Sequence, residues 1–358
     1  MIPHSRPTIE ADDLAAVDRV LRSGHLAQGR EVQAFEEEAA AALGLGGGVA
    51  TNSGTAALHL ALLSLGIGPG AEVLIPAYTC VALLHAVRLT GATARIVDSD
   101  PDTLNMGVEA ARRHLTAATR AIIVPHMFGT VAPVEAFRSL GVPIIENCAH
   151  ALGATVHGAP AGGAGDLAVL SFYATKMITT GEGGMLLSRS PDLLAVARDR
   201  RDYDHRATHR QRFNYKMTEM QAALGRSQLR KLSRFVERRE TLARIYRSAL
   251  REPAPAYTGL RDGDVVYRYV VRVPDPDAVI RSASAHGVEC KRPVHSPLDR
   301  LARTSFCPRA AEVFRHAVSL PLYPSLPEAT ARTIADLTAQ IVARPDEHAE
   351  VPSLGSPA

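Results

Sequence analysis

No part of the sequence approaches the roughly 20 consecutive apolar residues that a membrane-spanning helix needs, so we expect no membrane partner. The four cysteines are widely spaced and form no C-x-x-C pair, which argues against a structural zinc site or a disulfide framework. The 40 basic residues are balanced by 37 acidic ones without a block of like charge, so we expect no nucleic-acid partner. The first residues show no signal-peptide pattern, and we expect a cytoplasmic protein.

Two common nucleotide-binding motifs are also missing. The glycine cluster at residues 44–48 comes before a predicted strand, whereas the dinucleotide-binding G-x-G-x-x-G motif follows one. No Gly-Lys-Ser or Gly-Lys-Thr follows a glycine-rich loop, as a P-loop would require. These absences argue against a nicotinamide dehydrogenase and against a P-loop nucleotidase.

The pattern of apolar residues indicates an α/β fold. Short apolar runs alternate with longer amphipathic segments over the first two-thirds of the chain. This alternation predicts crossover units and therefore a mostly parallel sheet covered by helices. The predicted strands cover residues 72–76, 94–98, 121–125, 142–146, 166–171 and 184–188, and the predicted helices cover 54–65, 80–90, 107–115 and 131–139.

The pattern changes after about residue 217, which divides the chain into two expected domains. We expect a large α/β domain over residues 1–230 and a smaller α+β domain over residues 231–344. Residues 345–358 are rich in Pro, Ser and Glu without periodicity, and we expect a disordered tail there. The predicted elements of this second part are a long basic helix over 218–250, a strand over 267–273, and helices over 277–286 and 327–342.

The densest chemical signal is the stretch SFYATKMITTGEGG at residues 171–184. Lys176 lies five residues past the end of a predicted strand, in a loop rich in hydroxyl groups and glycines. Schiff-base chemistry needs a lysine that is held close to a cofactor and can lose its proton, which partial burial favours. A solvated lysine in a flexible loop fits the same residues, so this stretch alone leaves both interpretations open.

A second signal occurs where a predicted strand turns into a helix, at Ser53-Gly54-Thr55. The free N–H groups and the dipole at a helix start favour binding of a phosphate. An ordinary serine N-cap fits the same residues. Cys148 and His150 are two potential metal ligands without further partners, and we predict no metal site from them.

Three motifs occur in the order and spacing of one protein family. They are SGTAAL at residues 53–58, the stretch at 171–184, and NYKMTEMQAALG at 214–225. Over about residues 1–342 the chain resembles the DegT/StrS family of sugar aminotransferases, a branch of the fold-type I enzymes that depend on pyridoxal 5′-phosphate (PLP). The resemblance implies transfer of an amino group from glutamate or glutamine to a keto-sugar, often nucleotide-linked, or a keto-cyclitol. Pyridoxamine 5′-phosphate would alternate with PLP.

The resemblance also assigns roles to single residues. Lys176 would form the Schiff base and move the substrate proton, while Ser171 and the backbone of Gly54 and Thr55 would hold the phosphate. Asn214 would reach the phosphate from a neighbouring subunit, so a homodimer is implied in which each subunit completes the other's site. The remaining implied site residues are His150 and Cys80 at the cofactor ring, and Lys216, His295 and Tyr323 at the substrate.

Two positions depart from the family pattern. The usual Glu-Asp pair reads Glu146-Asn147, and a neutral amide replaces the carboxylate that supports a protonated pyridine nitrogen in relatives. Three explanations stay open: a differently tuned aminotransferase, another PLP reaction such as elimination, replacement or epimerisation, or a weakly active or non-catalytic PLP-binding paralogue. Lys216 stands where many relatives have arginine. Its ammonium group is a compact point charge, whereas the guanidinium group of arginine is planar and can donate two parallel hydrogen bonds.

Overall fold

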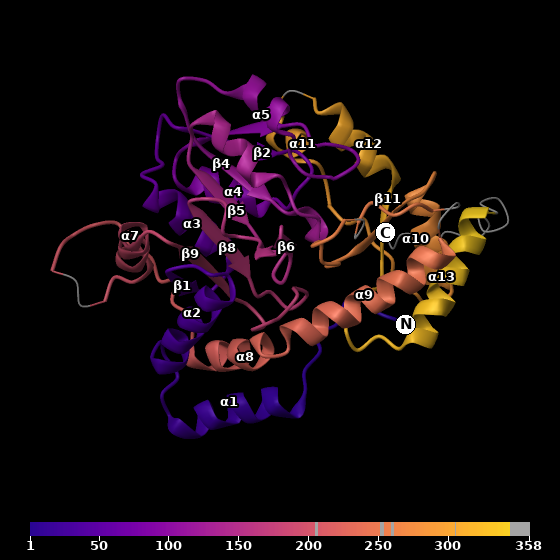
Figure 1. The fold of residues 1–358 in the computed structure, drawn as a ribbon, viewed down its shortest axis with the longest axis horizontal. Helices are drawn as coiled ribbons and strands as arrows, with labels where there is room; N and C mark the ends of the chain where they lie inside the picture. The colour runs from indigo at the N-terminus through magenta and orange to yellow at the C-terminus, as the bar shows by residue number, and fades with distance from the viewer. Residues whose placement is uncertain (205–206, 251–253, 259–260, 305, 344–358) are drawn as a thin grey trace, which may run out of the picture.

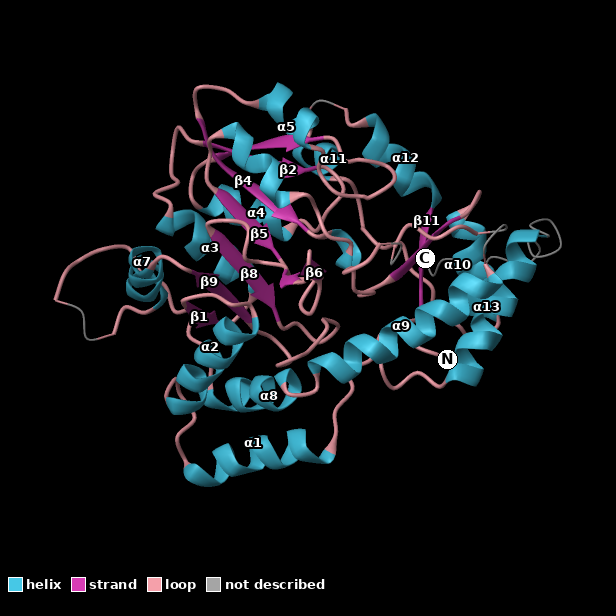
Figure 2. Ribbon diagram, viewed as in Figure 1, coloured by secondary structure: helices cyan, strands magenta, loops and turns pink. Residues whose placement is uncertain are grey.

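The computed structural model describes residues 1–204, 207–250, 254–258, 261–304 and 306–343. Its main sheet joins seven strands from this part of the chain and is surrounded by helices (Figures 1 and 2). In spatial order the strands are β1 (Gly47–Thr51), β9 (Gly184–Ser188), β8 (Leu167–Ser171), β5 (Ile144–Asn147), β4 (Thr119–Pro125), β2 (Glu72–Pro76) and β3 (Thr93–Val97).

The predicted, mostly parallel sheet is confirmed. Strands β8, β5, β4, β2 and β3 run parallel to one another, and β9 runs antiparallel to both β8 and β1. The carboxyl ends of the parallel strands therefore meet at one edge, and the loops that follow them lie together there. The helices that connect these strands are α3 (Gly54–Ser64), α4 (Ala82–Leu89), α5 (Val108–His114), α6 (Val134–Phe137) and the 3-10 turns η1 (Met127–Gly129) and η2 (Arg138–Leu140).

Both faces of the sheet are buried, as its near-continuous apolar strands predict. Along β4, Ile122 and Val124 pack in one cluster with residues of α5 and α6. The residue between them, Ile123, joins the larger cluster on the other face, together with residues of α3 and α4. This alternation follows from the two-residue period of a strand.

The C-terminal part has a small core of its own. Strands β10 (Tyr269–Arg272) and β11 (Ala317–Leu320) pair antiparallel. Buried residues on one side of this pair, such as Tyr269 and Leu320, pack with those of the helices over Leu232–Ala249, Pro276–Ala285 and Glu328–Ala343. The N-terminus lies beside these helices (Figure 1). The helices outside the sheet crossovers are α1 (Ala11–Ser23), α2 (Arg30–Ala42), α7 (Pro191–Arg201), α8 (Glu219–Leu229), α9 (Leu232–Ala249), α10 (Pro276–Ala285), α11 (Leu298–Ala302), α12 (Pro308–His316) and α13 (Glu328–Ala343), and a small hairpin joins β6 (Thr155–Val156) and β7 (Ala159–Pro160).

The expectation of one helix over 218–250 is wrong, because the chain forms α8 and α9 with a break between them. The amide of Lys231 donates to the carbonyl of Gln228, a tighter turn than the α-helical pattern. The Lys231 ammonium contacts the carboxylates of Asp12 and Asp13 at 2.8 and 2.7 Å. The break thus lies where a buried side chain is drawn toward α1 rather than at a glycine or proline.

Several further elements differ from their predicted bounds by one to three residues, and in two of them a proline explains the difference. Strand β5 starts at Ile144 rather than at residue 142, because Pro143 has no N–H to donate to a ladder. Helix α6 starts after Pro133 rather than at residue 131, because the residue before a proline is disfavoured in helical conformation. The predicted tail at 345–358 lies outside the described residues. Among the described helices, none combines the length and apolarity that crossing a membrane requires.

Candidate active site

A cavity of about 240 Å³ opens at the carboxyl edge of the sheet, where the loops after β1, β2, β5 and β8 meet. It brings together residues that lie between Ser53 and Glu182 in the sequence. Every residue assigned above to the cofactor lines it except Asn214. These lining residues are Gly54, Thr55, Cys80, Asn147, His150, Ser171 and Lys176, joined by Tyr173, Glu182 and Thr79, which the sequence did not single out.

The start of α3 forms one wall of the cavity. Ser53 is the N-cap, and its hydroxyl accepts a hydrogen bond from the amide of Ala56 at 3.1 Å. The amides of Gly54 and Thr55 precede that bond and, within the described chain, have no partner. The ordinary N-cap and the anion-binding helix start therefore coexist here, because the cap uses only one of the free amides.

Close packing explains two of the glycines at this wall. A Cβ on Gly54 would lie 2.8 Å from Cβ of Ser171, so only glycine lets the helix start approach the end of β8 this closely. A Cβ on Gly184 would collide with the carbonyl of Ser53. The close approach of the start of α3 to the ends of β8 and β9 therefore depends on both glycines.

Lys176 lies in an ordered loop. Its amide donates to the carbonyl of Tyr173, and the amides of Phe172 and Thr180 bond to the carbonyls of Gly183 and Phe172. The Nζ atom of Lys176 lies 5.0 Å from the ring centroid of Tyr267. This geometry disfavours the interpretation of Lys176 as a solvated lysine in a flexible loop.

His150 is held between two aromatic rings. Its ring stacks on Tyr267 with centroids 4.3 Å apart and lies parallel to Phe128 at 5.7 Å. Burial, together with the positive charges of Lys176 and Arg268, holds the pKa of His150 well below its usual value. The imidazole is therefore neutral at physiological pH.

Asn147 ends β5 and is 8% exposed. Its Oδ1 accepts a hydrogen bond from the amide of Ala149 at 3.2 Å. Because a backbone N–H can only donate, this contact identifies which end of the side-chain amide is the oxygen. The NH₂ end is left for a ligand in the cavity, and it can act only as a donor.

The residues behind Asn147 form a buried hydrogen-bonded network. His126 Nδ1 accepts from the amide of Ala132 at 3.0 Å, so its Nε2 carries the proton and donates to Glu146 at 3.1 Å. Glu146 also accepts from the amides of Gly162 and Gly165. Burial raises its pKa, but these hydrogen bonds, led by that of His126, outweigh burial and keep the pKa below the usual value.

Cys148 lies within ligand distance of His126 and Glu146, so the three residues have the geometry of a candidate metal site. Two observations speak against that use. The polar atoms of His126 and Glu146 already hold hydrogen bonds. Burial and the neighbouring carboxylate raise the pKa of the Cys148 thiol well above its usual value, whereas a metal ligand must be a thiolate.

Four predicted residues do not line this cavity. Asn214 is exposed, and its carbonyl accepts a hydrogen bond from the side chain of Asn52, next to Ser53. Lys216 lies in the same segment and pairs with Asp202 and Asp204 at 2.8 and 2.7 Å. His295 is exposed, and Tyr323 is buried in the C-terminal core.

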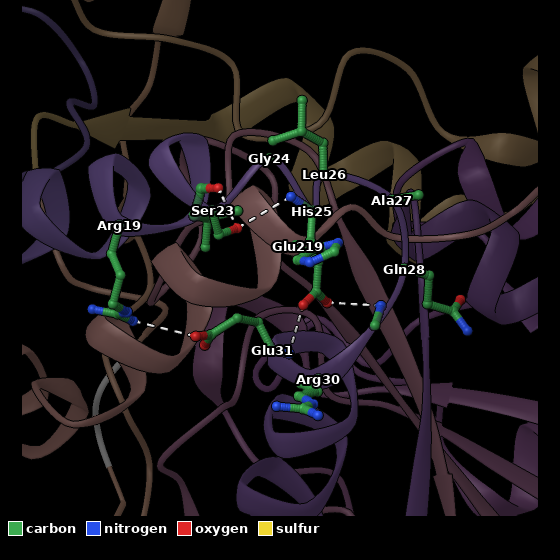
Figure 3. Close-up of a pocket in the computed structure, with 12 residues that line it drawn as sticks. Arg19, Ser23, Gly24, His25, Leu26, Ala27, Gln28, Arg30, Glu31 and Glu219 are labelled. Carbon is green, nitrogen blue, oxygen red and sulfur yellow. Dashed lines mark hydrogen bonds and ion pairs between the residues drawn. The ribbon is translucent and has the colours of Figure 1, made fainter.

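A larger hollow of about 880 Å³ lies elsewhere, between the end of α1 and the start of α2 (Figure 3). Its lining residues differ from those of the Lys176 cavity. The Glu219 carboxylate accepts hydrogen bonds from the amides of Gly29, Glu31 and Val32 at 2.8 to 2.9 Å. Glu219 thereby caps α2, whose own N-cap residue Gly29 has no side chain. Its carboxylate is occupied by these hydrogen bonds.

The model of the DegT/DnrJ/EryC1/StrS aminotransferase family matches residues 7–338 of this chain. The chain belongs to this family. The resemblance drawn from the three motifs is thereby confirmed, and so is the fold-type I architecture. Members of the family are PLP-dependent aminotransferases, and PLP is the cofactor of this chain.

Family members with curated functions include two sugar aminotransferases. The GDP-perosamine synthase of Caulobacter vibrioides is 36% identical over 291 residues, which are 75% of this chain and 77% of that protein. The dTDP-4-dehydro-2,3,6-trideoxy-D-glucose 4-aminotransferase of Saccharopolyspora spinosa is 33% identical over 369 residues, with 94% and 95% covered.

Solved structures of the family superimpose closely. The aminotransferase TlmJ from Streptoalloteichus hindustanus has a TM-score of 0.91 at 31% identity, covering 96% of this chain and 99% of that one. The PLP form of a putative sugar aminotransferase from Streptococcus pneumoniae has a TM-score of 0.88 at 25% identity, with 96% and 99% covered.

Proposed function

We propose that this enzyme transfers an amino group from glutamate or glutamine to a keto-sugar that is linked to a nucleotide. The observation that carries the proposal is the placement of Lys176, Ser171 and the start of α3 around one cavity. The curated relatives described above act on sugars linked to GDP or dTDP, which favours a sugar over a cyclitol as the acceptor.

The donors around the cavity fit PLP. The free amides of Gly54 and Thr55 and the hydroxyl of Ser171 would hold its phosphate, because a helix start with unpaired N–H groups favours an anion. Asn147 would donate its NH₂ group to the ring nitrogen, with neutral His150 beside the ring. When bound, PLP supplies a carbonyl group that a lysine amine can hold covalently and a ring that withdraws electrons.

Lys176 would hold the cofactor and also act as the base. Once released from the cofactor, its Nζ would take the proton from the substrate carbon and deliver it to the cofactor carbon to which the lysine had been attached. A neutral donor at Asn147 leaves the ring less electron-withdrawing than a carboxylate does. Membership in an aminotransferase family favours the first explanation of Asn147, a differently tuned aminotransferase, over a change of reaction type.

We also propose that two copies of the chain complete each other's sites. Asn214 and Lys216 do not line the cavity of their own chain, and Asn214 is exposed. An Asn214 that binds the phosphate of a partner subunit would account for both features. A division of each chain into domains over 1–230 and 231–344 is supported by the separate core around α9, α10 and α13.

The proposal is tested by following nitrogen from donor to acceptor. The purified enzyme is incubated with nitrogen-15 glutamate and a GDP- or dTDP-linked 4-keto-6-deoxy-sugar, and the sugar product is analysed by mass spectrometry. We expect the label in the sugar with the wild type and with Lys291→Ala, an exposed lysine away from the cavity. We expect no transfer with Lys176→Ala. Transfer of the label to the sugar by Lys176→Ala would contradict the proposal. A wild-type enzyme that leaves the sugar unlabelled with both glutamate and glutamine as labelled donors would also contradict it.

A further inference from the structure

Tyr267 is a buried aromatic residue directly behind the cavity. It is 3% exposed and belongs to the segment that leads into β10 of the C-terminal core. It does not line the cavity, but it contacts two residues that do, Lys176 and His150. No motif of the sequence singled it out.

The ring of Tyr267 meets both partners in favourable geometries. Lys176 Nζ lies 5.0 Å from its centroid, within the range in which an ammonium is attracted to the negative face of an aromatic ring. The His150 ring stacks on it with 17° between the planes. One side chain therefore fixes the position of the lysine relative to the imidazole.

The hydroxyl group of Tyr267 is anchored as well. It lies 3.1 Å from Oγ1 of Thr175, the residue before the lysine, and accepts a hydrogen bond from Arg268 at 3.3 Å. Arg268 is held in turn by His4, whose ring contacts Ser319 of β11 at 2.8 Å. The N-terminal segment and the C-terminal core thus support the phenol through Arg268.

The backbone at Tyr267 is hydrogen-bonded to the turn η1, which follows β4 of the large sheet. Its amide donates to the carbonyl of Phe128, and the amide of Val265 donates to the carbonyl of Gly129, both at 3.1 Å. Gly129 has a φ of 101°, and a Cβ there would collide with the Val265 carbonyl. Arg239 of α9 donates to the Tyr267 carbonyl at 3.0 Å. A ring mounted this rigidly can position its neighbours.

Positive charges surround the phenol. Burial on its own raises the pKa of Tyr267, but Lys176, Arg268 and Arg239 and the hydrogen bond with Thr175 outweigh it and lower the pKa to about 8. The stacked His150 is neutral and adds no charge. Lys176 and Arg268 both lie 5.0 Å from the centroid of the ring, within the range of a cation–π contact.

We propose that Tyr267 is a positioning residue. Its ring fixes the positions of Lys176 Nζ and of the His150 imidazole relative to the cofactor. The inference rests on the proposed role of Lys176. It predicts that the ring is needed and that the hydroxyl group is not. A phenylalanine at position 267 should therefore preserve this function, whereas a leucine should not.

The test compares Tyr267→Leu, Tyr267→Phe and Thr175→Val, the last of which removes only the partner of the hydroxyl group. Two properties of the holoenzyme are measured: the affinity for PLP, and the visible circular dichroism of the lysine-bound cofactor, which reports its fixed orientation. We expect Tyr267→Leu to bind PLP about 3- to 30-fold more weakly with reduced dichroism. Tyr267→Phe and Thr175→Val should stay within about twofold of the wild type. A Phe or Val variant as impaired as Tyr267→Leu would overturn the proposal.

A leucine variant that fails to fold is replaced by a graded series. Phenylalanines with an increasing number of fluorine atoms at position 267 keep the shape of the ring and weaken its negative face. PLP affinity should fall stepwise along the series, and a flat series would overturn the proposal. A wild type without a lysine-bound cofactor band would overturn the proposed function together with this inference. A normal wild-type band that Tyr267→Leu leaves unchanged would overturn this inference alone.

Discussion

Replacing Asn147 by aspartate turns one buried neutral donor into an anionic acceptor and leaves its other contact in place. The Oδ1 atom keeps the hydrogen bond from the amide of Ala149. A hydrogen bond to an ionised partner contributes about 1.5–3 kcal/mol, against about 0.5–1.5 kcal/mol for a neutral one. The gain of about 1–1.5 kcal/mol in support for a protonated ring nitrogen corresponds to about a tenfold faster proton abstraction.

The same change has a cost in the absence of cofactor. Position 147 is 8% exposed, so the new carboxylate is buried without a cationic partner until PLP binds. We expect the apoenzyme to lose roughly 1–3 kcal/mol of its free energy of unfolding and to regain it when PLP is added.

The assay for Asn147→Asp is a single turnover with L-glutamate, followed by stopped-flow absorbance, with thermal unfolding recorded with and without PLP. Asn147→Leu is the matched control, because it removes the amide and adds no charge, and we expect it to bind PLP more weakly. A half-reaction rate of Asn147→Asp at or below that of the wild type would refute the reasoning about the ring nitrogen.

Three further changes test the structure around the site. Gly54→Ala places a methyl group against Ser171 and should weaken PLP binding about tenfold, whereas Gly68→Ala, with no contact closer than 3.9 Å, should leave the affinity unchanged. Glu219→Gln removes the charge that caps α2 and should lower the free energy of unfolding in urea by about 1.5–3 kcal/mol, and an unchanged value would contradict the capping role. The pKa of Glu146 is lower in the folded than in the unfolded protein, so its stabilisation is complete above the unfolded pKa of about 4.5 and is lost as the pH falls through the folded pKa. Glu146→Gln should therefore flatten the acid limb of the plot of unfolding free energy against pH, and an unaltered limb would contradict this.

The parts of the fold that local patterns determine could be predicted from the sequence. Apolar runs with turn residues at both ends gave β2, β4 and β9 close to their observed bounds. The break between α8 and α9 could not be predicted, because the helical pattern is continuous there. Its cause is the contact of Lys231 with Asp12 and Asp13, more than 200 residues away in the sequence.

The candidate site divides in the same way. Lys176, Ser171 and Gly54 lie in motifs at strand ends, and parallel strands bring their ends to one edge. Tyr267 lies in an ordinary strand-like pattern, and its contacts with Lys176 and His150 come from the packing of the C-terminal core against the sheet. No local signal distinguishes such a residue.

The central claim is that Lys176 holds PLP and that the enzyme accepts an amino group from an amino acid. The most direct measurement is the absorption spectrum of the purified protein before and after addition of L-glutamate or L-glutamine, with Lys176→Ala measured in parallel. We predict a band near roughly 410–430 nm in the wild type only, which the amino donor replaces by a band near roughly 330 nm. A band that persists in Lys176→Ala, or one that no amino donor changes, would contradict the account.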